Sequence, residues 1–187
     1  YLQFDQVVVP DDHLLGEVGG GFLVAQTRLG GGRIHHAMRT IGEARKTGFS
    51  PTFLGFNGAY SDLIPKLGGK AMDGLYATMT VQHPYLDEAS QPLRFWANKY
   101  KTRYNEDPGV YSTYGYILLD TFIKGAQKAG PDLSTDSFIK AMDTMVVPPD
   151  IFGSAEATFG PQKRLGNNLS RLSQITDGRW KVISEYV

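Results

Sequence analysis

The order of hydrophobic patterns after Pro51 constrains the fold of this chain more than any other feature. A short apolar run, TFLGF (52–56), precedes an Asn-Gly turn signal at 57–58 and a short helical stretch. Residues 74–81, GLYATMTV, then alternate apolar and polar side chains, as in a strand with one buried face. Three segments with apolar residues at helical spacing follow, and then an Asp-Gly hairpin signal at 177–178. This order predicts a mixed α/β fold.

The alternating strand and the three helical segments supply most of the expected core. Ser61 is predicted to cap the short helix that Gly68 and Gly69 end, and Ser134 or Thr135 is predicted to cap the last of the three later helices. The expected apolar faces are Leu75, Ala77, Met79 and Val81 on the strand, Leu93, Trp96, Tyr100 and Tyr104 on the first helix, Tyr111, Tyr114, Leu118, Phe122 and Ala126 on the second, and Phe138, Met142 and Met145 on the third.

The first part of the chain has a different pattern. Residues 1–10 alternate and are rich in β-branched side chains, which predicts a strand. Residues 11–22 are a glycine-rich turn, and residues 22–45 show helical spacing. Three glycines at 30–32 are expected to interrupt this helix or to let another backbone approach closely.

The sharpest change of character lies between Lys46 and Pro51. We therefore divide the chain into residues 1–46, a junction at 47–50, and residues 51–187.

Composition excludes several classes of function. The 187 residues carry 19 basic and 19 acidic side chains, so no net charge favours a sequence-independent grip on nucleic acid. There are no cysteines, which rules out disulfides, thiolate nucleophiles and cysteine metal sites. No apolar run has the length that a membrane-spanning segment requires. The first residue is Tyr1 and no basic-then-apolar leader is visible, so we expect a processed or truncated N-terminus.

Catalytic, cofactor and metal motifs are missing from the sequence. The glycine clusters match neither the dinucleotide-binding pattern nor the P-loop, and no G-x-S-x-G elbow occurs. His35 and His36 are neighbours on a helix, so their side chains point about 100° apart and do not converge on one ion. We therefore predict no catalytic residue, no metal site and no cofactor. Tyr111 and Tyr114 open a helix just after EDPG, where they can face a cleft and bind a small amphiphilic ligand.

Part of the first segment resembles the acyl-CoA dehydrogenase family. The matching motifs are VPDDHLLGEVGGGF and LGGGRI, within residues 4–45. In that family this stretch ends the middle β-domain and enters the helical domain, and Arg33 matches the arginine that opens a helix beside the acyl-CoA crevice. The family binds FAD, but the upstream flavin-contacting strands and the catalytic glutamate region have no counterpart in the chain. An FAD-dependent dehydrogenase-related fragment is therefore an alternative function, not the first one.

Residues 51–187 are similar to the C-terminal half of periplasmic solute-binding proteins of the branched-chain amino acid type. The matching motifs are FLGFNGAYSDLIPKLGGKAMDGLYATMTV, FWANKYKTRYNEDPGVYSTYGYILLDTFIKGAQKAG and ATFGPQKRLGNNLSRLSQITDGRWKVISEYV. The resemblance implies part of a type I periplasmic-binding-protein fold, with a three-layer arrangement of sheet and helices, preceded by a short strand-plus-helix segment. It also implies a small-molecule ligand, a periplasmic location and an ABC transporter permease as partner.

The resemblance identifies three candidate ligand-binding residues. Asn57 occupies the position at which amino acid-binding members place an acid for the ligand's ammonium group. Asparagine brings hydrogen bonds without charge, so a neutral, amide-like or aromatic ligand is allowed. Tyr111 matches an aromatic position lining the cleft, and Phe56 is adjacent to Asn57. We predict a truncated amino acid- or amide-binding protein; the third alternative is a chimeric fragment that retains neither parent's function.

Overall fold

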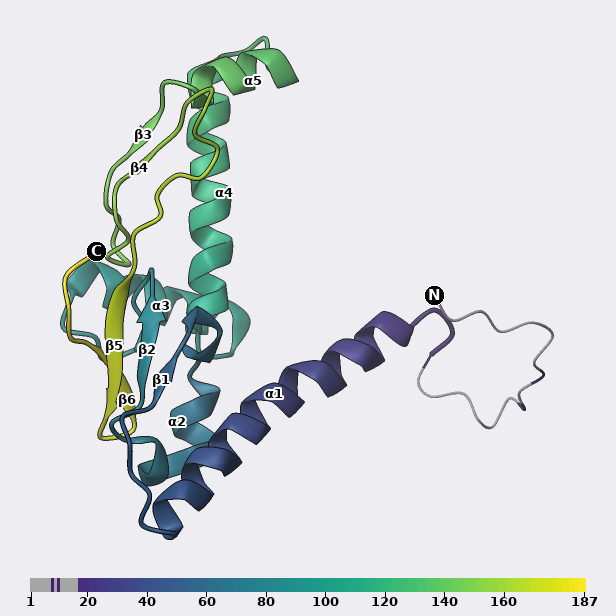
Figure 1. Ribbon diagram of the computed structural model, residues 1–187. Coiled ribbons are helices and arrows are strands. Elements are labelled where there is room, and N and C mark those ends of the chain that lie inside the picture. Colours follow the sequence, from purple (N-terminus) through teal and green to yellow (C-terminus); the bar gives the residue numbers. More distant parts are fainter. Residues whose placement is uncertain (1–7, 9, 11–16) are drawn as a thin grey trace.

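A computed structural model describes residues 8, 10 and 17–187; for residues 21–31, 33 and 34 it describes the backbone alone. Its main layer is a four-stranded sheet in the order β1-β2-β5-β6. A separate two-stranded sheet pairs β3 with β4 near the C-terminal end of helix α4 (Val110–Ala129) (Figure 1). The strands are β1 (Leu54–Gly55), β2 (Tyr76–Met79), β3 (Val146–Val147), β4 (Ala157–Thr158), β5 (Arg171–Thr176) and β6 (Arg179–Val182).

Five α-helices and two 3-10 turns complete the described part of the chain. One long helix extends from the end of the four-stranded sheet to the two-stranded one, and the first helix crosses the base of the molecule and projects from it (Figure 1). The elements are α1 (Gly21–Lys46), η2 (Asn57–Ala59), α2 (Leu63–Gly68), η3 (Gly69–Met72), α3 (Gln91–Tyr104), α4 (Val110–Ala129) and α5 (Thr135–Met142).

The main sheet is mixed. β1 pairs with β2 in parallel, whereas β2 and β5, and β5 and β6, pair antiparallel. The β5–β6 hairpin turns at Asp177 and Gly178, with φ angles of 53° and 72°. Two consecutive positive φ values define the turn that matches the twist of a two-residue hairpin, which explains the Asp-Gly pair. The predicted hairpin is thus confirmed, and β1 lies at the edge of the sheet.

Most elements expected after Pro51 are present. The alternating strand buries the predicted face, with Leu75, Ala77, Met79 and Val81 at most 4% exposed. The three later helices occur as α3, α4 and α5, and the Ser134 hydroxyl caps α5 by accepting the Ser137 N–H (3.2 Å). α2 ends at Gly68, and the residue that caps it, Gly69, has a φ of 56°, which suits glycine.

Helix α1 joins the first part of the chain to the core. It is continuous from Gly21 to Lys46, so the predicted interruption at 30–32 is wrong. Met38 and Ile41 are buried within the same core as the sheet residues, and Arg45 Nη2 donates to the Asp73 carbonyl (2.5 Å). The predicted strand 1–10, apart from residues 8 and 10, and the first half of the turn 11–22 lie outside the described residues.

The predicted apolar face of α4 is wrong for three of its five members, although Tyr114 packs against the core. Tyr111, Leu118 and Phe122 are more than half exposed. The buried positions are Val110, Thr113 and Gly125. Gly125 admits α5, since a Cβ atom there would lie 2.7 Å from Met142 Sδ. Both faces of α4 carry apolar residues, so periodicity alone could not select the packed one.

Aromatic residues close the core beneath the main sheet. The Trp180 indole N–H donates to the Ser61 carbonyl (2.8 Å), and the Trp180 and Tyr60 rings lie 5.1 Å apart. These contacts link β6 to the turn before α2, which are far apart in sequence. None of the helices described is long and apolar enough to cross a membrane.

His83 is a buried titratable group whose protonation opposes folding. It is 6% exposed, its ring stacks on Tyr85 at 4.3 Å, and neither ring nitrogen has a hydrogen-bond partner among the described residues. Burial lowers the pKa of the imidazole to about 4, with Asp62 opposing that shift. The unfolded chain therefore takes up the proton first as the pH falls, near the ordinary pKa of about 6.5.

We expect acid to destabilise the protein through His83. The His83 contribution to stability is fully present above about pH 6.5 and is lost as the pH falls toward 4, by about 2–3 kcal/mol. Urea unfolding at pH 7 and pH 4.5 measures the loss. His83→Phe keeps a ring beside Tyr85 and removes the titration, so its loss over the same interval should be smaller by this amount. Equal losses in both proteins would contradict the assignment.

Candidate functional site

Asn57 lies between the end of β1 and the first turns of α4. It begins η2 and is separated from the edge strand by Phe56 alone. The Tyr114 hydroxyl, one turn into α4, donates to Asn57 Oδ1 at 3.0 Å across 57 residues of sequence. The tight turn depends on Gly55, since a Cβ atom there would lie 2.5 Å from the Ala59 Cβ. The local sequence thus holds the Asn57 amide against α4.

Tyr114 also connects Asn57 to the end of β2. Its hydroxyl lies 3.4 Å from Thr80 Oγ1, so Thr80 can donate to Tyr114 while Tyr114 donates to Asn57. The Tyr186 hydroxyl in turn donates to the Thr80 carbonyl (2.8 Å). Burial raises the pKa of Tyr186, which keeps it a neutral donor. The Tyr114 hydroxyl, with Thr80 behind it, thus holds the oxygen of the Asn57 amide.

The Asn57 amide presents its nitrogen as the free group. Its oxygen accepts from Tyr114, and Nδ2 donates to none of the residues that the structure describes. An amide nitrogen carries two N–H donors and no acceptor. The position therefore suits a carbonyl or carboxylate oxygen better than an ammonium group.

Phe56 and Tyr111 supply exposed aromatic surface around this amide. They are 76% and 74% exposed. The Tyr111 ring lies 6.2 Å from that of Tyr114, edge to face, and the Phe56 ring covers Gly58, where a Cβ atom would lie 2.5 Å from it. The structure thus places Phe56 and Asn57 in one turn, and it places Tyr111 on α4 next to Tyr114, the hydrogen-bond partner of Asn57. Their role in ligand binding stays a prediction.

Two further residues of this cluster, Tyr114 and Thr80, were not among the three candidate ligand-binding residues. Tyr114 was expected to face a cleft beside Tyr111, and its bond to Asn57 gives it a definite partner. Thr80 was not singled out. It sits on the polar face of the alternating strand, and that position is the only signal the sequence holds for it.

The remaining candidate positions do not join this cluster. The side chain of Arg33 lies outside the described residues, so its likeness to the crevice arginine stays a prediction. His35 and His36 are exposed on α1. In the part of the chain that the structure describes, no three His, Asp or Glu side chains converge as metal ligands.

A short stretch of the chain is similar to acyl-CoA dehydrogenases. A probable acyl-CoA dehydrogenase of Mycobacterium tuberculosis is 53% identical over 45 residues. That match covers 24% of this chain and 11% of the dehydrogenase. A likeness of this extent does not show an enzyme.

Solved structures of ABC transporter binding proteins share the fold. A branched-chain amino acid ABC transporter protein from Thermus thermophilus, with bound valine, has a TM-score of 0.66 at 16% identity, covering 81% of this chain and 43% of that one. A fatty acid ABC transporter substrate-binding protein from Thermomonospora curvata has a TM-score of 0.65 at 18% identity, covering 81% and 40%. The chain thus spans about two fifths of the length of these proteins.

The fold is therefore part of a type I periplasmic-binding-protein fold, as the sequence predicts. The model of the periplasmic binding protein family matches residues 25–179, which is most of the chain and includes most of α1. The division at 47–50 stays a prediction. The chain belongs to the periplasmic binding protein family.

Proposed function

We propose that this chain binds a small apolar carboxylate or amide, as a truncated substrate-binding component of an ABC transporter. One observation carries the proposal: the Tyr114 hydroxyl occupies Asn57 Oδ1 and leaves the two N–H groups of Nδ2 as donors. The ligand oxygen lies at Asn57, and its apolar part lies against Phe56 and Tyr111. The periplasm is the proposed location and the transporter permease the proposed partner, both by family.

The two structural neighbours support this ligand chemistry. One holds valine, and the other is named for fatty acids. Both ligands join a carboxylate to an apolar body, which is what a donor amide beside two aromatic rings would select. Valine also carries an ammonium group, for which Asn57 provides no charge. A ligand without an ammonium group therefore fits the site better than an amino acid.

We expect isovalerate and isovaleramide to bind more tightly than valine, because neither buries an unpaired ammonium group. Isothermal titration calorimetry of the folded chain measures the three affinities. Asn57→Ala should weaken isovalerate binding by about ten- to a hundredfold, since one hydrogen bond to a charged group is worth about 1.5–3 kcal/mol. Tyr114→Phe should weaken it less, because it frees the amide to rotate but keeps its nitrogen.

Asn168→Ala is the matched control. This asparagine is exposed on the segment before β5, and its removal should leave the affinities unchanged. Two results would contradict the proposal. One is the absence of binding heat for all three compounds with a sample that unfolds cooperatively. The other is an Asn57→Ala protein that binds as tightly as the parent.

We propose that the dehydrogenase-like stretch, residues 4–45, stabilises the fold and binds no flavin. The end of α1 contributes Met38 and Ile41 to the core, which is a structural role. Flavin absorption in the purified chain would overturn this part of the proposal and favour the dehydrogenase alternative.

A further inference from the structure

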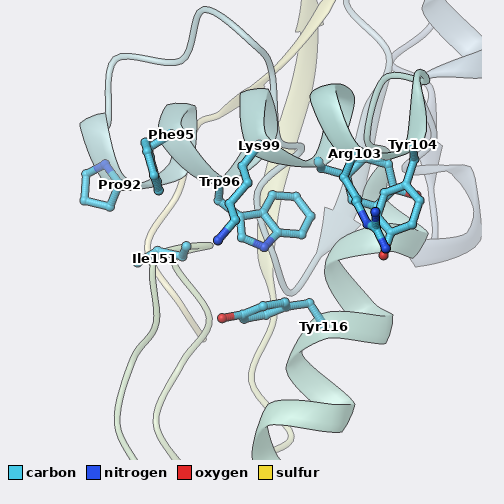
Figure 2. A pocket seen from close by; sticks show the side chains of 9 residues that line it. Pro92, Phe95, Trp96, Lys99, Arg103, Tyr104, Tyr116 and Ile151 are labelled. Atoms are coloured by element: carbon cyan, nitrogen blue, oxygen red, sulfur yellow. The ribbon is translucent and has the colours of Figure 1, made fainter.

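A cavity of about 500 Å³ opens between α3, α4 and the loop that contains Ile151 (Figure 2). It shares no lining residue with the Asn57 cluster. Its volume lies within the range of about 300–1,000 Å³ that small-ligand sites occupy. The cavity is therefore large enough for a ligand of its own.

Aromatic rings form the floor of this cavity. Trp96 meets Phe152 edge to face at 4.8 Å and Tyr116 at 5.6 Å. Phe152 is only 1% exposed, so it anchors both rings to the core. Tyr100 extends the row, with its ring 5.6 Å from Trp96. Tyr116 is nevertheless 47% exposed, which leaves ring surface available to a flat ligand.

Two cations share the cavity with these rings. Lys99 and Arg103 lie one turn apart on α3 and extend to the same cavity as Trp96 (Figure 2). Neither forms an ion pair with the residues that the structure describes, whereas Lys101 on the same helix pairs with Asp107 at 2.7 Å. Among the described residues, the Glu106 carboxylate accepts a hydrogen bond from the hydroxyl of the lining residue Tyr100 at 3.0 Å. The cavity thus combines ring surface with two positive charges that form no ion pair with the described residues.

We propose that this cavity is a second ligand site, which takes a planar aromatic carboxylate. The ligand ring lies against Trp96 and Tyr116, and its carboxylate lies between Lys99 and Arg103. A guanidinium group matches a carboxylate with two parallel N–H donors, and the lysine adds a compact charge. An aliphatic acid would forgo the ring contacts, and a neutral aromatic molecule would forgo the charge.

The test uses ¹⁵N NMR of the two tryptophan indole N–H groups during titration with 2-naphthoate. Trp96 lines the cavity, and Trp180 is buried with its N–H donated to the Ser61 carbonyl, so it serves as the internal reference. We expect a saturable shift of the Trp96 signal, no shift of the Trp180 signal, and about fivefold weaker binding of naphthalene-2-carboxamide. An unmoved Trp96 signal, or equal binding of acid and amide, would overturn the proposal.

Two variants separate this site from the first one. Lys99→Gln combined with Arg103→Gln should weaken 2-naphthoate binding about tenfold, as expected for two partly exposed charge contacts. Lys101→Gln is the control on the same helix and should change it less than twofold. Asn57→Ala should leave the 2-naphthoate titration of the Trp96 signal unchanged, because Asn57 does not line this cavity, so failure at Asn57 and failure at this cavity give different results. A double variant that binds 2-naphthoate as tightly as the parent would contradict the proposal.

Discussion

Replacing Phe152 by alanine lowers the free energy of unfolding by about 3–5 kcal/mol. The side chain is 1% exposed and is among the largest that the core encloses. Its ring meets Trp96 and Tyr116, so its removal leaves a cavity where the loop after β3, α3 and α4 come together. Urea unfolding followed by tryptophan fluorescence measures the loss as a lower midpoint at unchanged slope.

Phe95→Ala is the matched control for this substitution. Phe95 lies on α3 and is 69% exposed, so the same chemical change should alter stability by less than about 0.5 kcal/mol. If Phe152→Ala lost no more than Phe95→Ala, the packing described for the loop and the two helices would be wrong.

Replacing Met38 and Ile41 together by alanine lowers the free energy of unfolding by about 4 kcal/mol. Both side chains of α1 are more than nine-tenths buried, and they contact the same core as the sheet residues. The free energy of unfolding of a domain is only about 5–15 kcal/mol in total, so a loss of this size leaves the folded state marginally stable. Urea unfolding measures it, and the transition should stay a single cooperative one.

The matched control replaces His36 and Arg39, two exposed residues of the same helix, by alanine. This pair should change stability by less than about 1 kcal/mol, because it removes no buried surface. Similar midpoints for the two double variants would mean that α1 does not stabilise the sheet. Residues 1–46 and 51–187 would then behave as independent pieces.

The sequence predicted the elements whose signals are local. The hairpin follows from Asp177 and Gly178, because few other residues adopt positive φ so readily. The buried face of β2 follows from strict alternation over eight residues. Strands β3 and β4 were missed, since two residues each are too few to show a period.

Features that depend on contacts between residues far apart in the sequence could not be predicted from a local pattern. The packed face of α4 was decided by Gly125, which makes room for α5, and not by the more conspicuous aromatic stripe. The end of α1 enters the core across the very junction where the sequence changes character.

The candidate site, too, could be predicted from the sequence only in part. Asn57 was predicted from a resemblance to one family, and the turn signal around it is local. The direction of its amide depends on Tyr114, which is 57 residues away, and on Thr80 behind it. Hydrogen bonds between side chains so far apart leave no periodic trace in the sequence.

The exposed apolar stripe of α4 also governs how molecules of this protein meet one another. Tyr111, Leu118 and Phe122 attract any similar surface in water. The chain has no net charge to oppose that attraction near neutral pH, since 19 basic side chains match 19 acidic ones. Weak short-range attraction without long-range repulsion limits solubility. Moderate salt should then do little to keep concentrated samples dispersed, and a shift of pH away from neutrality should do more.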